Sequence, residues 1–220
     1  MDIFDIIGPV MVGPSSSHTA GAVRIGLIAR NILGEAPAAA RIALHGSFAL
    51  TGKGHGTDRA LAAGILGMSP DDPRIPDSLR LAEGEGLQIS FTQEDLGEVH
   101  PNTARVELTG ASGRTCRVQA SSVGGGNIAV TNVNGIEVDF DGRRATLVVV
   151  HRDRRGVVAA VAETLTRAGC NIAAMRLYRT EKHGDAFMIL QTDEPPAEEL
   201  VARLGALEHV QEASVLPPVA

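Results

Sequence analysis

The order of elements in the last third of the chain is the strongest constraint on its fold. Apolar periodicity there predicts strand, helix, strand, strand, helix and strand in succession. The six segments are residues 145–151, 155–168, 171–180, 185–192, 195–206 and 210–216. This order is that of a ferredoxin-like domain. We therefore expect a separate C-terminal domain over residues 145–220.

The residues before this domain predict a mixed arrangement, with helices first and then mainly antiparallel strands, which makes the chain α+β. The stretch 141–144 has the composition of a boundary, so the first domain is expected over residues 1–142. Residues 2–12 fit either a short helix or an extended lead-in, residues 36–40 a turn, and residues 68–77 a surface connection. The expected helices are 22–33, 59–66 and 77–85, and the expected strands 41–45, 87–91, 103–109, 115–121, 127–133 and 136–140.

Composition limits the partners of the chain. It has 220 residues, a formal charge of −6 and an apolar fraction of 44%, as in globular proteins. The negative charge argues against nucleic acid or an anionic membrane as a partner. No apolar run is long enough to span a bilayer, and the acidic N-terminus lacks the basic start of a signal peptide. We expect a cytoplasmic protein in which Cys116 and Cys170 are small buried residues rather than a disulfide.

A polar cluster precedes the first predicted helix. Ser15, Ser16, Ser17, His18 and Thr19 lie between two glycines and directly before the apolar run 22–33. A helix N-terminus offers free N–H groups and partial positive charge, which suit a carboxylate or a phosphate. The alternative is an ordinary N-cap with a spare histidine. Five such side chains in a row exceed what a cap needs, so we favour a binding role.

A second polar stretch, residues 46–58, contains four glycines. Its glycine spacing does not fit a phosphate-binding loop, and Gly54 stands after Lys53 where serine or threonine is required. We expect a glycine-rich loop that brings Lys53, His55 and Thr57 to the start of a helix capped by Thr57 or Asp58. The alternative is a flexible turn with incidental polar groups. A histidine between two glycines has little covering it, which favours function.

These stretches resemble the beta chain of bacterial iron–sulfur L-serine dehydratases, enzymes that convert L-serine to pyruvate and ammonia. The resemblance rests on Gly13-Pro-Ser-Ser-Ser-His-Thr-Ala-Gly21, on residues 46–58 and on His100-Pro101-Asn102. In the C-terminal domain, residues 153–156 and 169–172 and Met175 resemble the ACT family. The first domain is also similar to the substrate-sensing (allosteric-substrate-binding) domain of some phosphoglycerate dehydrogenases.

The resemblance implies a [4Fe–4S] cluster whose open iron polarises the serine hydroxyl. Such clusters normally take several cysteine thiolates, and this chain has two cysteines far apart in sequence. The cluster is therefore expected on a separate alpha subunit, with no metal ligand in this chain. Pyridoxal phosphate is the competing dehydratase cofactor and needs a Schiff-base lysine. With only Lys53 and Lys182 in a domain of this size, we exclude it.

The resemblance also implies roles for individual residues. His55 is the expected base for the α-proton of serine, since the ordinary pKa of histidine lies near working pH. His18 with Ser15, Ser16, Ser17 and Thr19 is expected to hold the substrate carboxylate. His100 is expected to relay protons or position the substrate. Further substrate contacts are expected from Lys53, Thr57 and Asn102. The remaining histidines are expected to be structural or solvated: His45, His151, His183 and His209.

ACT domains commonly pair side by side and bind amino acids near the loop after their first strand. Gly156 and Asn171 match that position and are the expected effector-binding residues, with a homodimer contact through this domain. A structural role remains open for both, since Gly156 lets the backbone turn into a helix and Asn171 caps a strand. The alternative to a dehydratase subunit is a non-catalytic amino-acid sensor of serine metabolism.

Overall fold

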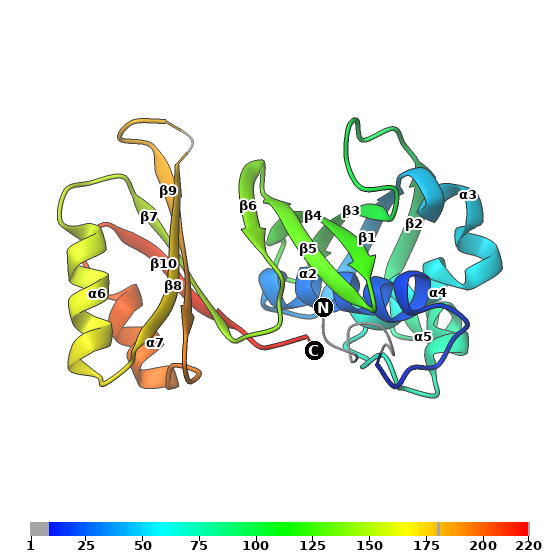
Figure 1. Ribbon diagram of the computed structural model, residues 1–220, viewed down its shortest axis with the longest axis horizontal. Helices are drawn as coiled ribbons and strands as arrows, with labels where there is room; N and C mark the ends of the chain where they lie inside the picture. The colour runs from blue at the N-terminus through cyan, green and yellow to red at the C-terminus, as the bar shows by residue number, and fades with distance from the viewer. Residues whose placement is uncertain (1–8, 180, 220) are drawn as a thin grey trace. The chain divides into compact units, whose positions relative to one another are not determined.

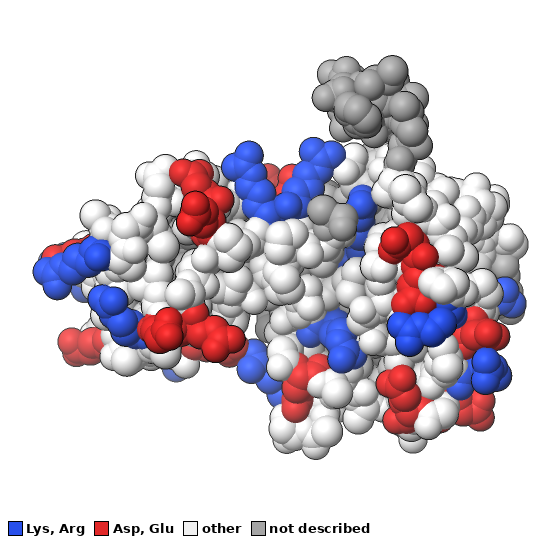
Figure 2. Space-filling view, turned by 90° about the horizontal axis from the view of Figure 1, so that it is seen from below, with Lys and Arg blue, Asp and Glu red and all other residues white. Residues whose placement is uncertain are grey.

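The computed structural model of the chain describes residues 9–179 and 181–219. Its backbone contacts divide the chain between Asp141 and Gly142 into two units, coloured blue to green and green to red in Figure 1. The expectation for residues 2–8 lies outside the described part. No helix within the described residues is long and apolar enough to cross a membrane. On the face shown in Figure 2, basic and acidic side chains are interspersed.

The first unit is a mixed sheet with helices packed on it. The strand order is β2-β1-β3-β4-β5-β6; β1 and β2 are parallel and the other neighbours antiparallel. The strands are β1 (Pro37–Leu44), β2 (Gln88–Gln93), β3 (Thr103–Gly110), β4 (Thr115–Gly124), β5 (Asn127–Val133) and β6 (Ile136–Phe140). The helices are η1 (Ser16–Gly21), α2 (Ala22–Leu33), α3 (Gly46–His55), α4 (Thr57–Ile65), η2 (Ile75–Asp77) and α5 (Ser78–Gly84). The helices α3 to α5 make the crossover that parallel strands require.

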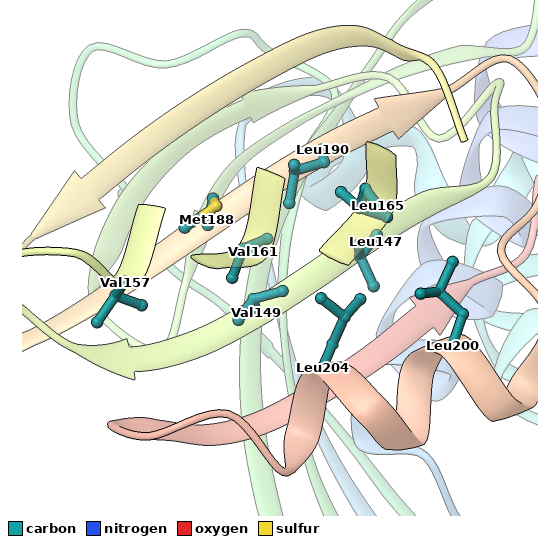
Figure 3. Close-up of a cluster of buried hydrophobic side chains, with 9 residues drawn as sticks. All are labelled: Leu147, Val149, Val157, Val161, Leu165, Met188, Leu190, Leu200 and Leu204. Atoms are coloured by element: carbon teal, nitrogen blue, oxygen red, sulfur yellow. The ribbon is translucent and has the colours of Figure 1, made fainter. Parts of the chain in front are cut away.

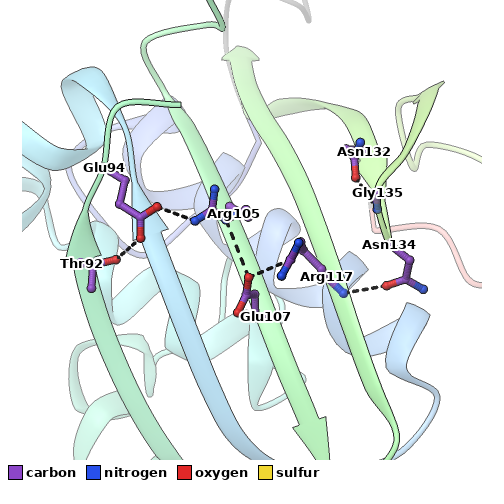
Figure 4. A network of polar contacts seen from close by, with 8 residues as sticks. All are labelled: Thr92, Glu94, Arg105, Glu107, Arg117, Asn132, Asn134 and Gly135. Carbon is purple, nitrogen blue, oxygen red and sulfur yellow. Dashed lines mark hydrogen bonds and ion pairs between the residues drawn. The ribbon is translucent and has the colours of Figure 1, made fainter. Parts of the chain in front are cut away.

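One face of this sheet is apolar and the other is charged. Alternate residues of β3 and β4, such as Val106 and Val118, are fully buried, and Cys116 reaches the backbone of α2. The opposite face carries a chain of ion pairs, drawn in Figure 4, in which Arg105 links Glu94 to Glu107. Arg117 closes the chain at 2.8 Å from Glu107. Glu94, Arg105, Glu107 and Arg117 thus form one continuous row of opposite charges on this face.

The structure corrects several sequence-based boundaries in this unit. The turn expected over residues 36–40 is wrong, because β1 already begins at Pro37. The loop expected over residues 46–58 is wrong as well: it forms α3 and α4, separated only by Gly56 in the left-handed conformation, φ 71°. Thr57 and Asp58 lie inside α4, and no side chain caps it, so the expected cap is also wrong. Glycine content concealed a helix that tertiary contacts stabilise.

The second unit has the predicted ferredoxin-like order and confirms that part of the fold. Its elements are β7 (Thr146–Arg152), α6 (Val157–Arg167), β8 (Ile172–Arg179), β9 (Asp185–Thr192), α7 (Glu198–Gly205) and β10 (Val210–Leu216). The antiparallel sheet has the order β10-β7-β9-β8. Figure 3 shows its core, in which Leu147 and Val149 of β7 and Leu190 of β9 face Val161 of α6 and Leu204 of α7.

The helices α2 and α4 pack so closely that their contact requires glycine. A Cβ atom added at Gly64 would lie 2.0 Å from the Val23 carbonyl oxygen, and one at Gly26 would lie 2.4 Å from that of Leu61. Gly64→Ala should therefore force the helices apart and lower the free energy of unfolding by about 1–3 kcal/mol or more. Gly84→Ala is the matched control, since a Cβ there meets nothing within 4 Å. Urea unfolding of both variants tests this; equal stability of the two would contradict it.

Candidate functional site

The polar cluster of residues 15–19 forms the start of a helix, as predicted, but the helix starts earlier and in a different form. The turn Ser16–Gly21 is π-helical and runs directly into α2. Ser15 is its N-cap, and its hydroxyl accepts a hydrogen bond from the His18 backbone N–H at 3.2 Å. Ser15 thus has the ordinary capping role, while Ser16 and Ser17 lie half-buried in the first turn. π-helical turns occur frequently at functional sites.

Both glycines of this motif are required by close packing. A Cβ at Gly13 would lie 2.4 Å from the Thr19 hydroxyl oxygen, and one at Gly21 would lie 2.1 Å from that of Ser122. Thr19 and Ser122 are themselves buried, and neither hydroxyl has a hydrogen-bond partner among the described residues. The turn is therefore packed tightly on β4, which holds His18 in place.

His18 and His55 come together, as the shared site predicted for them requires. The centroids of their rings are 4.9 Å apart, with an angle of 41° between the planes. Nε2 of His18 lies 3.0 Å from Oγ1 of Thr51 and 3.2 Å from Oγ of Ser47. Nδ1 of His55 lies 3.1 Å from the Thr51 carbonyl oxygen. The buried ring of Phe48 packs edge-on against His18, with centroids 5.3 Å apart. The helix α3 therefore supplies most of the contacts that orient this histidine pair.

The histidine pair has a distinct electrostatic character. Partial burial of His18 lowers its pKa below the ordinary value, and the nearby His55 lowers it further. The neutral imidazole of His18 is therefore favoured around neutral pH. His55 is exposed at the C-terminal end of α3. One imidazole is thus shielded and the other open to solvent.

The third predicted segment supports α3 instead of joining the histidine pair. The Pro101 carbonyl accepts a hydrogen bond from the Ser47 backbone N–H at 2.8 Å, at the N-terminus of α3. The exposed His100 ring accepts one from the Asn102 backbone N–H at 3.1 Å. No hydrogen bond or ring contact between described residues connects His100 with His18 or His55. The structure therefore places His100 in a turn that anchors the site.

The remaining residues predicted to contact substrate differ in how accessible they are to solvent. Thr57 is fully buried at the start of α4, and its hydroxyl has no hydrogen-bond partner among the described residues. Asn102 is half-buried, and its carbonyl accepts a hydrogen bond from the Ser122 backbone N–H. Lys53 belongs to α3, but its side chain lies outside what the structure describes. Sequence reasoning missed Ser47 and Thr51, because their four-residue spacing with His55 indicates a common face only in a helix, and a loop was expected there.

The expected effector residues lie in the second unit. Gly156 precedes α6 in the left-handed conformation, φ 92°, and a Cβ there meets nothing within 4 Å. Asn171 donates through Nδ2 to Asp193 at 2.8 Å, which joins the start of β8 to the end of β9 and favours the structural alternative for Asn171.

His151 is buried, with Nδ1 donating to the Arg152 carbonyl at 2.8 Å and Nε2 without a partner among the described residues. Of the two roles expected for His151, structural or solvated, its burial favours the structural one.

The cysteines of this chain do not fit an iron–sulfur cluster. Burial raises the pKa of Cys116 to about 11, so the side chain stays a thiol. Cys170 lies in the other unit, and both cysteines are free. The described residues contain no group of three or more His, Cys, Asp or Glu side chains that could hold a metal ion. The described residues of this chain therefore offer no ligand set for a cluster.

The fold and the site define a chain with a histidine-bearing α+β unit followed by an ACT-like unit. Residues 1–133 match the serine dehydratase beta chain family, and residues 145–209 match the ACT domain family. The chain is 40% identical to the probable L-serine dehydratase beta chain of Bacillus subtilis, with 94% of each chain covered. It is 40% identical to the L-serine dehydratase beta chain of Peptoniphilus asaccharolyticus, with 93% of each covered. The chain therefore belongs to the serine dehydratase beta chain family and carries an ACT domain.

A weaker similarity concerns a different enzyme. D-3-phosphoglycerate dehydrogenase of Methanocaldococcus jannaschii is 30% identical over 87 residues, which cover 40% of this chain and 17% of that enzyme. The two family matches and the two beta-chain relatives confirm the family and the ACT domain that were expected from the sequence.

The repulsion between His18 and His55 can be measured. In His55→Gln the neighbouring positive charge is lost, so protonation of His18 becomes easier and its pKa should rise. The rise should recover only part of the shift, because burial is the larger cause and remains. Titration of the His18 ring protons by NMR in both proteins tests this. A His18 pKa that stays the same or falls in His55→Gln would show that the two rings do not interact.

Proposed function

We propose that this chain is the beta subunit of a cytoplasmic L-serine dehydratase that releases pyruvate and ammonia. The single observation that carries the proposal is the pairing of His18 with His55 by α3, in a chain of this family. A separate alpha subunit would supply the [4Fe–4S] cluster and its Lewis acidity. This chain would supply a proton acceptor and contacts to L-serine.

His55 is the proposed base. It is exposed, so a substrate can approach the ring, and its Nδ1 is held by the Thr51 carbonyl at 3.1 Å. A base must come within hydrogen-bond reach of the proton that it removes. With nothing near a Cβ position at Gly54 or Gly56, the backbone on either side leaves room for such an approach.

His18 and the adjacent turn are the proposed carboxylate site. The hydroxyls of the turn can donate hydrogen bonds to the carboxylate, and a neutral His18 imidazole with a lowered pKa does not repel the ammonium group of the substrate. Ser16, Ser17 and Asn102 are only half-buried, and we assign direct contacts to them. Thr19 and Thr57 are closed off from solvent, so contact with serine requires the packing around them to open. We retain His100 and Lys53 as candidates for proton relay and anchoring, respectively, and Ser15 as the cap that holds His18.

The alternative function is a non-catalytic amino-acid sensor. Its support is the similarity to part of a phosphoglycerate dehydrogenase. The alternatives differ in one observable: a dehydratase subunit confers serine deamination on a cluster-bearing partner, whereas a sensor does not.

Reconstitution with a cluster-bearing alpha chain under anaerobic conditions tests the function. The mixture should deaminate L-serine, and this chain alone should not. His55→Ala should reduce turnover about 10²–10⁴-fold, the typical contribution of general-base catalysis, while cluster content and assembly survive. Exchange of the serine α-proton with solvent deuterium should fall in parallel.

His18→Ala is the comparison variant, expected to raise KM more than it lowers kcat if His18 holds substrate. Near-normal turnover and exchange in His55→Ala would transfer the base role to His100 or to the partner chain. Absence of deamination by the wild-type mixture would favour the sensor.

We also propose that the ACT domain pairs with a second copy through the edge strand β8. Met175 and Leu177 lie opposite Leu190 and Met188 of β9, so they continue the apolar face of the sheet. They are nevertheless 44% and 47% exposed. An apolar edge strand with unpaired backbone groups is a template for pairing with another strand. An effector such as serine would bind near Gly156 and Asn171, with His151 as a further polar group in the same domain.

Charge substitutions at β8 test this pairing. Met175→Lys and Leu177→Lys should each shift the protein from dimer to monomer. In a dimer paired through β8, the introduced lysine would be buried against the second copy of the chain. Val123→Lys on β4 is the matched control, since Val123 is a 50% exposed apolar residue of the other unit. Light scattering after size-exclusion chromatography measures the mass. A wild-type monomer at high concentration, or dimers in both β8 variants, would contradict pairing through β8.

A further inference from the structure

Thr51 stands at the centre of the hydrogen bonds that orient both histidines. Its side-chain oxygen lies 3.0 Å from Nε2 of His18, and its carbonyl oxygen lies 3.1 Å from Nδ1 of His55. The two atoms reach different rings because His55 lies one helical turn after Thr51 on α3, whereas His18 comes from η1. One residue therefore determines where two imidazole protons lie.

The tautomer of His55 follows from its partner. A carbonyl oxygen accepts hydrogen bonds and cannot donate, so the proton of the neutral ring lies on Nδ1. Nε2 of His55 then carries the lone pair. No hydrogen bond from Nε2 to a described side chain accompanies the Nδ1 contact, Lys53 being outside the described side chains. Nε2 is thus the nitrogen of His55 that can accept a proton.

The tautomer of His18 follows from the proton of Thr51. The Thr51 hydroxyl donates that proton to the Ser47 carbonyl at 2.9 Å, a common bond for threonine in a helix. Its oxygen can then only accept, so the proton in the 3.0 Å contact comes from Nε2 of His18. Oγ of Ser47, at 3.2 Å from the same nitrogen, is a second oxygen facing this proton. The lone pair of His18 then lies on Nδ1.

We propose that Thr51 is a positioning residue that fixes His18 and His55 in opposite neutral tautomers. Nδ1 of His18 and Nε2 of His55 are then the basic nitrogens, and both rings keep their protons on α3. The catalytic meaning rests on the proposed function: the α-proton of serine would move to Nε2 of His55 while Nδ1–H stays bonded to the Thr51 carbonyl. The electron pair of the broken C–H bond would form the Cα–Cβ double bond as the β-hydroxyl leaves. The shielding that favours neutral His18 agrees with this arrangement.

The tautomers can be read directly from the full chain. Two-bond proton–nitrogen correlation spectra of ¹⁵N-histidine-labelled protein, above the pH at which both rings titrate, distinguish a protonated ring nitrogen from a bare one. The wild type should show Nε2–H for His18 and Nδ1–H for His55. In Thr51→Val, His18 should move towards a mixture of tautomers or to Nδ1–H, because its nearer acceptor is gone and the remaining Ser47 hydroxyl can donate to a bare Nε2 as well as accept from Nε2–H. His55 should not change, because the carbonyl remains. Thr51→Ser should restore the wild-type pattern.

Two spectra would overturn the proposal: Nδ1–H on His18 in the wild type, or an unchanged His18 in Thr51→Val. If Thr51→Val does not fold, the wild-type and Thr51→Ser spectra still decide it. In the reconstituted enzyme, Thr51→Val should lose about tenfold in kcat/KM, as expected for one hydrogen bond, and Thr51→Ser should regain it. Unchanged kcat/KM in Thr51→Val would overturn the positioning role. A wild-type mixture that does not deaminate serine would refute the proposed function, and the spectra would still decide the tautomers.

Discussion

The candidate site depends on how the N-terminus of α3 is held. The first amides of a helix have no partners within the helix, and here the Pro101 carbonyl accepts from Ser47 at 2.8 Å. Gly46 must be glycine, since its φ is 52° and a Cβ would lie 2.7 Å from that carbonyl. Phe48 then anchors the helix by complete burial. The segments 46–58 and 100–102 therefore pack together and jointly hold α3 in place, although 41 residues separate them in sequence.

The extent to which this could be predicted differs between the two units. In the second unit Leu147 and Val149 alternate with half-exposed residues, and α6 has a plain apolar stripe, so local periodicity suffices. The same alternation places His151 among the buried residues, which distinguishes the structural from the solvated alternative expected for it. In the first unit α3 contains Gly52 and Gly54, and glycine disfavours helix by about 1 kcal/mol each. Its stability comes from Pro101 and Phe48, contacts that no local pattern reveals.

The candidate residues show the same division. His18 and His55 were identified by resemblance, but their contact depends on η1 and α3 packing together, which spacing does not predict. Ser47 and Thr51 were hidden because a loop has no helical face on which residues 47, 51 and 55 align. The role proposed for His100 follows from its motif, and the structure shows in addition that the Pro101 carbonyl of this motif supports α3. Residue types therefore indicated the chemistry, and tertiary packing determined which of them meet.

The exposure of the histidine pair bears on the need for a partner. Thr51 and His55 are exposed, and hydrogen bonds and charges act more weakly in water than in a closed site. Leu50, directly before Thr51, is 84% exposed, and burial of a leucine stabilises an interface by about 1.5–3 kcal/mol. Leu50 belongs to the same helix, α3, as Thr51 and His55. A partner that buries Leu50 would therefore bind the helix that orients the histidines proposed to transfer protons.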